Sequence, residues 1–164
     1  KYYTSTDSAK TYQYAKADCL QFGTIIIPSS LVENGKTVVE MFQQGNSNVL
    51  DIPAVMIYAQ DENSLTYTGV ITQVPKTAQA YTKTLQTAFY VRYRSSADAE
   101  WTYAFSDGVS ERSYFECADA ALKNDYNSTK LPNPTEAQKK IIQQLNEITQ
   151  VVESTGWIGG DNWY

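Results

Sequence analysis

The side chains of this sequence that are best suited to chemistry are aromatic. Planar rings stack on the apolar faces of sugars, and neighbouring Asn, Gln and Asp side chains can then hydrogen-bond the sugar hydroxyls. The candidate ligand-binding residues are Trp101 and Tyr103 on one predicted strand, and Trp157, Trp163 and Tyr164 in the C-terminal tail. They predict an aromatic platform for polysaccharide that needs no cofactor. The competing interpretation is that the strand residues pack under helices and the tail forms a hydrophobic clasp.

The sequence contains no histidine, which removes the commonest general base and the commonest transition-metal ligand. Catalytic sites built on Ser-His-Asp or Cys-His, and histidine zinc sites, are therefore excluded. A carboxylate pair can still hydrolyse a glycosidic bond, and Glu100 and Asp107 flank the aromatic strand. Carboxylates at strand ends are ordinarily solvated. We therefore rank a weak glycoside hydrolase third and expect a non-catalytic protein.

Oxygen-bearing side chains follow an EF-hand-like spacing in the polar segment 125–136. The candidate calcium ligands are Asp125, Asn127, Thr129, Asn133 and Glu136. Lys130 stands where the sharp turn of such a loop requires glycine, and two prolines interrupt the segment. We therefore interpret the segment as a solvated linker and predict no metal site.

Cys19 and Cys117 are the two cysteines of the chain. One pair cannot build a disulfide-dense scaffold. A single bridge between an early and a later helix competes with two small buried hydrophobic residues. The second interpretation is favoured because free cysteine is among the most buried residue types.

Composition narrows the class of partner. The net charge is −5 and the pI about 4.7, and the basic residues are scattered, so nucleic acid is not an expected partner. No apolar run approaches the roughly 20 residues of a membrane-spanning helix, which argues against membrane insertion. Thirteen tyrosines among many hydroxyl and amide side chains are typical of exported bacterial proteins.

Three consecutive isoleucines make the segment Phe22 to Ile27 the strongest structural signal. β-Branched residues favour a strand, and a strand that is apolar on both faces must be covered on both sides. Pro28 ends it because proline cannot donate to a sheet ladder. We therefore expect this segment to be the central strand.

The remaining pattern predicts alternating strands followed by helices. Strands are expected at residues 2–6, 37–42, 49–58, 65–74, 84–94 and 100–106, and helices at 8–21, 110–122 and 135–155. Turn signals between successive strands favour antiparallel pairing. The last helix begins with a capping box, Thr135 to Gln138. The predicted fold class is α+β, with a mainly antiparallel sheet of about five or six strands covered by two or three helices.

The domain organisation follows from these elements. We expect an α+β core domain at residues 1–122, a linker at 123–134, a C-terminal helix at 135–155 packed on the core, and an aromatic tail at 156–164.

Five motifs follow one another in a defined order. They are Phe22 to Pro28, Asp51 to Val55, Tyr67 to Pro75, Phe89 to Tyr93 and Ser110 to Tyr114. Their order is similar to that of ancillary, non-catalytic domains of large surface-anchored or dockerin-bearing proteins secreted by anaerobic Gram-positive gut and rumen bacteria. The resemblance covers about residues 1–122 and implies a secreted or cell-surface location rather than an activity. Such domains have a longer lead-in strand, so the first strand here is either cut short or completed by another segment or chain.

The leading functional hypothesis is a non-catalytic extracellular module that binds polysaccharide for a bacterial cell-surface or cellulosome-like protein. The alternative is a structural spacer or assembly domain that contacts neighbouring domains or subunits through an edge strand or the aromatic tail.

Overall fold

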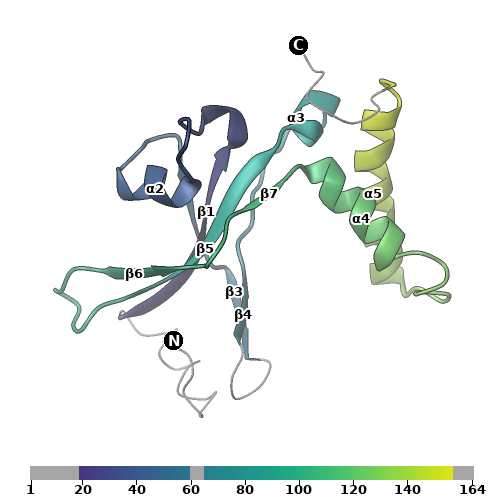
Figure 1. Cartoon of the computed structure of the whole chain (residues 1–164). Helices are drawn as coiled ribbons and strands as arrows, with labels where there is room; N and C mark the ends of the chain where they lie inside the picture. The colour runs from purple at the N-terminus through teal and green to yellow at the C-terminus, as the bar shows by residue number, and fades with distance from the viewer. Residues whose placement is uncertain (1–18, 60–64, 157–164) are drawn as a thin grey trace. The chain divides into compact units, whose positions relative to one another are not determined.

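A computed structural model describes residues 19–59 and 65–156 of the protein (Figure 1). Contacts divide the chain into two compact units. Of the described residues, the first unit, the sheet unit, comprises 19–59, 65–72 and 86–110, and the second, the helical unit, comprises 73–85 and 111–156. Each unit is described below by itself.

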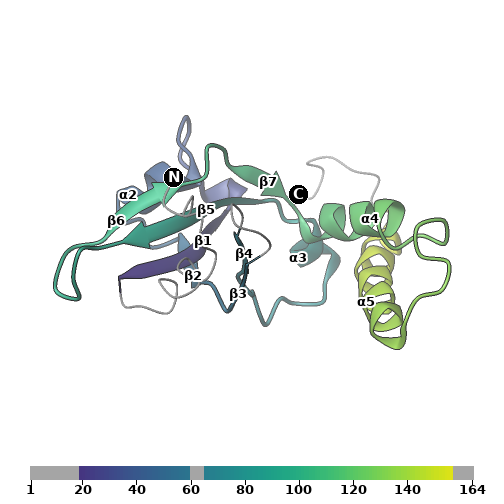
Figure 2. The same cartoon turned by 90° about the horizontal axis from the view of Figure 1, so that it is seen from below.

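Among the described residues the main sheet has five strands, and its central strand is the one predicted from the isoleucine run. The strands are β1 (Leu20–Pro28), β2 (Leu50–Pro53), β5 (Leu85–Tyr93), β6 (Thr102–Phe105) and β7 (Ser110–Arg112). They lie in the order β2-β1-β5-β6, and β7 also pairs with β5 (Figure 2). The β1–β2 and β5–β6 pairs are antiparallel. The predicted α+β class with a mainly antiparallel sheet is therefore confirmed.

A second, two-stranded sheet belongs to the same unit. Its antiparallel strands are β3 (Met56–Ala59) and β4 (Leu65–Thr68). The predicted strand at 49–58 is therefore wrong as a single element: it is divided between two sheets, because Pro53 ends β2 and cannot continue the ladder. The predicted strand at 65–74 likewise ends early, at Thr68.

The central strand is covered on both faces, as its sequence requires. On one face Ile25 and Ile27 pack in a cluster with Tyr90 of β5 and with helix α2. On the other face Phe22 packs against Tyr67 of β4, with 5.3 Å between the ring centroids. The short helix η1 (Ser29–Leu31) follows β1 directly.

Helix α2 (Val38–Gln43) corrects the predicted strand at 37–42. Thr37 caps it: the Thr37 Oγ1 accepts from the Glu40 amide at 3.4 Å, and the Thr37 amide donates to Glu40 Oε2 at 2.8 Å. This capping box satisfies two donors that would otherwise be orphaned at the helix start. Val38 and Met41 are buried beneath the helix, so its apolar residues follow helical and not strand spacing.

Two other predicted helix boundaries are also wrong. The end of the predicted 8–21 helix belongs to β1, which begins at Leu20, and residues 1–18, including the predicted 2–6 strand, lie outside the described residues. The helix expected from Ser110 is preceded by β7. Helix α4 (Tyr114–Asn124) begins after Ser113, which forms its own capping box with Glu116.

The helical unit consists of α3 (Ala78–Thr82), α4 and α5 (Glu136–Glu153), which contact one another pairwise (Figure 1). The predicted capping box of α5 is confirmed, because Thr135 and Gln138 cap each other. Gly156 follows the helix with φ +74°, a left-handed conformation suited to a helix end. Within this unit α5 packs on α4 and α3, and the predicted domain boundary at residue 122 falls inside α4.

Tyr90 ties three strands of the sheet together. Its ring lies directly over Gly23 of β1, and its hydroxyl donates to Asp51 Oδ1 of β2 at 2.6 Å. From the opposite face the Tyr67 hydroxyl is shared between two carbonyl oxygens, that of Gly23 at 3.2 Å and that of Tyr90 at 3.1 Å. The absence of a side chain at Gly23 therefore lets Tyr90 cross the central strand on one face, while Tyr67 bonds the Gly23 carbonyl from the other.

Replacing Gly23 by alanine should destabilise the sheet unit by about 2–3 kcal/mol, because the new Cβ would overlap the hydroxyl and ring of Tyr90. Urea denaturation measures the change in free energy of unfolding. Gly108→Ala is the matched control, since nothing lies within 4 Å of its Cβ position, and it should change stability by less than about 0.5 kcal/mol. Equal effects of the two substitutions would contradict the close approach of Tyr90 to Gly23.

The stability of the protein should fall in alkali because of Tyr90. Burial, together with the hydrogen bond to Asp51, raises the pKa of Tyr90 above its ordinary value of about 10. A raised folded pKa gives stability that is complete below about pH 10 and is lost as the pH rises further, by about 1 kcal/mol per pH unit. Denaturation at pH 9 to 11.5 should show a steeper decline for the wild type than for Tyr90→Phe. Parallel pH profiles for the wild type and Tyr90→Phe would contradict the assignment of the alkaline loss of stability to Tyr90.

Candidate binding face

The predicted aromatic strand lies beside a pair of arginines. β5 pairs with β6 so that Arg92 lies opposite Tyr103 and Tyr93 opposite Thr102. Because side chains alternate along a strand, Arg92 and Arg94 share the face of Tyr90. We call Gln21, Arg92, Arg94, Trp101 and Tyr103 the Arg-Trp cluster.

Both guanidinium groups approach the Trp101 ring. The Arg92 Cζ lies 4.7 Å and the Arg94 Cζ 4.3 Å from the ring centroid of Trp101. The Arg92 Cζ is also 5.9 Å from the ring centroid of Tyr103. A cation within about 6 Å of an aromatic face is attracted by the ring quadrupole, by roughly 0.5–2 kcal/mol. These contacts hold Trp101, which is half-buried, in place.

Hydrogen bonds fix the plane of Arg92. Its Nη1 donates to the Tyr103 hydroxyl at 3.0 Å, and its Nε donates to Gln21 Oε1 at 2.8 Å. Its Nη2 donates to the same Gln21 oxygen. The guanidinium therefore bridges β1 and β6 from its own position on β5, between them.

The charge on Arg92 is secure. Burial acts to lower the pKa of Arg92, but the hydrogen bond to Tyr103 and the electrostatic interactions with Tyr103, Tyr90 and Asp51 outweigh it, and the net shift is upward. The cluster consequently presents a permanently positive group between two aromatic side chains.

The structure separates the aromatic residues of β6 into two environments. Phe105 packs in the core, 6.0 Å from the ring of Phe42 and 6.4 Å from that of Tyr90. Tyr103 touches both regions, since its ring lies 5.5 Å from that of Phe42 while its hydroxyl contacts Arg92. Trp101 lies outside the α2 cluster, beside the two arginines.

The remaining predicted platform residues, Trp157, Trp163 and Tyr164, lie outside the described residues. Gln21, Arg92 and Arg94 belong to the Arg-Trp cluster, although the sequence pattern does not single them out. The sequence does carry a signal for the arginines, because Tyr90, Arg92 and Arg94 alternate along one face of the chain. The short turn that follows brings the chain back so that Trp101 lies beside the end of β5.

The predicted carboxylate pair is not brought together. Glu100 and Asp107 are exposed and lie beyond opposite ends of β6. They are seven residues apart along the chain, which at about 3.3 Å per residue is up to roughly 23 Å, whereas the two carboxyl groups of glycosidases lie about 5–10 Å apart. A weak glycosidase built on these two residues has no geometric support.

The candidate calcium loop uses its side chains for local structure. Asn127 Oδ1 accepts from the amides of Thr129 at 3.0 Å and Lys130 at 2.9 Å, and Glu136 pairs with Lys139 at 2.7 Å. Among residues 19–59 and 65–156, no group of three or more Asp, Glu or Cys residues is arranged to hold a metal ion. Such turns within a chain segment are typical of a solvated linker.

The two cysteines are free thiols. Cys19 is half-buried at the start of β1, and Cys117 is exposed on α4. The expectation of two buried hydrophobic residues is therefore wrong for Cys117. In α4 it is Ala118 that lies on the buried face of the helix, and the preceding residue, Cys117, is exposed.

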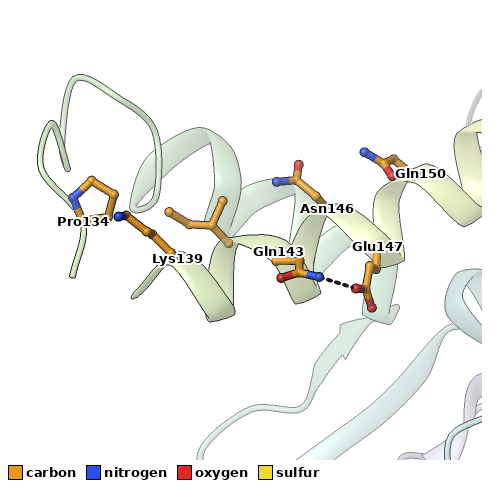
Figure 3. A pocket seen from close by; sticks show the side chains of 7 residues that line it. Pro134, Lys139, Gln143, Asn146, Glu147 and Gln150 are labelled. Carbon is orange, nitrogen blue, oxygen red and sulfur yellow. Dashed lines mark hydrogen bonds between the residues drawn. The ribbon is translucent and has the colours of Figure 1, made fainter. Parts of the chain in front are cut away.

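A hollow lies along the surface of α5 in the helical unit (Figure 3). It has a volume of about 630 Å³ and is lined by Pro134, Lys139, Ile142, Gln143, Asn146, Glu147 and Gln150. Gln143 Nε2 donates to Glu147 Oε1 at 3.2 Å across one turn of the helix. Its residues come from one helix and the segment before it, so it is a shallow amide-rich surface.

Comparisons with known proteins add no relative. No protein-family model matches the sequence, and searches of curated proteins and of solved structures find no significant similarity. Within the described part of the chain, no helix combines the length and apolar character needed to cross a membrane.

Replacing Trp101 by alanine should lower the free energy of unfolding by about 1 kcal/mol, because it removes cation–π contacts rather than core packing. Ile25→Ala is the reference, since Ile25 is fully buried and its truncation should cost about 3 kcal/mol. Urea denaturation of both variants gives the comparison. A loss for Trp101→Ala as large as that for Ile25→Ala would assign Trp101 to the core instead.

Proposed function

We propose that this chain is a non-catalytic extracellular module that binds polysaccharide for a bacterial cell-surface or cellulosome-like protein. The observation that carries the proposal is the position of Trp101, which lies outside the apolar core and is held by Arg92 and Arg94. An aromatic ring held by polar neighbours is suited to stacking on a sugar.

The chemistry of the Arg-Trp cluster supports a sugar ligand. The half-buried ring of Trp101 offers apolar surface, while the Tyr103 hydroxyl and the Gln21 amide supply hydrogen-bonding groups beside it. All five residues belong to or adjoin strands of one sheet, so the group is held on a rigid base. A face of this kind can bind sugar without histidine or metal.

The extracellular location rests on composition and on the resemblance to ancillary domains of secreted Gram-positive proteins. Thirteen tyrosines and many uncharged polar residues accompany the net charge of −5. Such a module would tether its parent protein to a polysaccharide and serve adhesion.

The second candidate is a spacer or assembly domain. It is favoured by apolar side chains beside the edge strand β2: Leu50 is 56% and Val55 is 62% exposed. An edge strand can pair with another chain. Pro53 limits this route, because it removes one ladder donor from a strand of four residues.

Affinity electrophoresis against neutral and acidic plant polysaccharides tests the proposal. At least one polysaccharide should retard the wild type, and Trp101→Ala should weaken that retardation at least about tenfold, corresponding to 1.4 kcal/mol of binding energy. Phe89→Ala is the matched control, because Phe89 is 48% exposed but packs with Tyr67 on the other face of the sheet. The variants Trp157→Ala and Trp163→Ala measure how much the C-terminal tail contributes to polysaccharide binding.

Retardation by no polysaccharide would overturn the binding function. If the same protein then sedimented as a dimer that Leu50→Lys dissociated, the assembly function would replace it. Equal losses for Trp101→Ala and Phe89→Ala would move the binding site away from the Arg-Trp cluster.

A further inference from the structure

We infer that the Arg-Trp cluster recognises the carboxylate of an acidic sugar, so that the polysaccharide bound is rich in uronic acid. This inference rests on the proposed polysaccharide-binding function and specifies its ligand class. It is carried by the hydrogen bonds and stacking contacts of Arg92.

Arg92 keeps donors available for an anion. A guanidinium has five N–H donors in one plane, and the three hydrogen bonds to Gln21 and Tyr103 use three of them. Two N–H groups of Arg92 thus have no partner among the described residues. Planar N–H groups of this kind match the two oxygens of a carboxylate, and charge-assisted bonds are about twice as strong as neutral ones.

The partners that hold Arg92 are neutral. Gln21 contributes an amide oxygen, Tyr103 a hydroxyl and Trp101 a ring. The ion pairs within the described part of the chain all join a lysine to a carboxylate, and none involves Arg92. Asp51, which adds negative potential at Arg92, accepts the hydrogen bond of Tyr90. The positive charge of Arg92 is therefore positioned without being neutralised by a contact.

A second positive group adjoins the first. The guanidinium carbons of Arg92 and Arg94 both lie within about 5 Å of the centroid of the Trp101 ring, so two positive groups adjoin one aromatic side chain. A carboxylate bound at this ring would be attracted by the charge of Arg92 while its sugar ring contacted Trp101. A neutral sugar would gain the ring contact without this attraction.

The net negative charge of the whole chain favours a ligand that presents one carboxylate-bearing sugar to the cluster over a nucleic acid. Nucleic-acid binding needs several cationic contacts along a strand of phosphates, whereas this chain carries a net charge of −5 with its arginine pair confined to one cluster. Local attraction over short range also predicts that binding weakens as salt is added.

Affinity electrophoresis in gels containing polygalacturonate or its fully methyl-esterified form tests the inference. The two polymers share a backbone, but esterification removes the carboxylate charge. The wild type should bind polygalacturonate at least about tenfold more tightly than the ester. Arg92→Gln should abolish this preference, and Arg92→Lys should restore it only in part because lysine lacks the planar fork. Arg112→Gln, at an exposed arginine of β7, is the matched control and should behave as wild type.

The possible outcomes distinguish failure of acid recognition from failure of the proposed polysaccharide binding. Equal binding of polygalacturonate and its ester would overturn acid recognition while leaving polysaccharide binding in place. A preference for polygalacturonate that survived Arg92→Gln would likewise overturn the assignment to Arg92. Absence of binding to these and to all neutral polysaccharides would overturn both. Urea denaturation of each variant identifies any loss that comes from unfolding.

Discussion

Tyr90 crosses the central strand at Gly23, where any side chain would displace its ring, and reaches Asp51 on the far side. Contacts on both faces of the sheet meet at this crossing. On one face the ring of Tyr90 packs against Phe42 of α2, at 6.3 Å between centroids. On the other, the carbonyl of Tyr90 shares the hydroxyl of Tyr67 with that of Gly23. The packing of Tyr90 against the helix therefore depends on a residue without a side chain.

The same row of side chains leads from the core to the candidate binding face. Tyr90 lies two residues before Arg92 on β5, and its ring lies 5.4 Å from that of Tyr103. Tyr103 in turn contacts Arg92 through its hydroxyl. Packing inside the unit thus determines where the guanidinium lies, and the transition from apolar to charged occurs within one pair of strands. This explains how a sheet with an ordinary core can hold a cation rigidly beside an aromatic ring.

The elements that depend on the composition of a short segment can be predicted from the sequence. The contacts that depend on pairing between distant strands cannot. The run Ile25 to Ile27 is apolar enough to identify the central strand by itself, and Thr135 to Gln138 identifies the start of α5. The sequence does not indicate helix α2 clearly, because the helix has only six residues and four of them are apolar, although Thr37 and Glu40 carry a capping signal. Trp101 was recognised as a candidate from its type. Its contact with Arg92 requires the β5–β6 register, and Gln21 is brought in through β1, which single residues do not reveal.

Gly23 also restricts the register in which β1 and β5 can pair. In a sheet, slipping one strand by a single residue transfers every side chain to the opposite face. Here such a slip would also place the ring of Tyr90 over Phe22 or Thr24, neither of which leaves room for it. The one position in β1 that lacks a side chain therefore selects a single alignment with β5. Misaligned pairings of β1 and β5 are therefore disfavoured sterically.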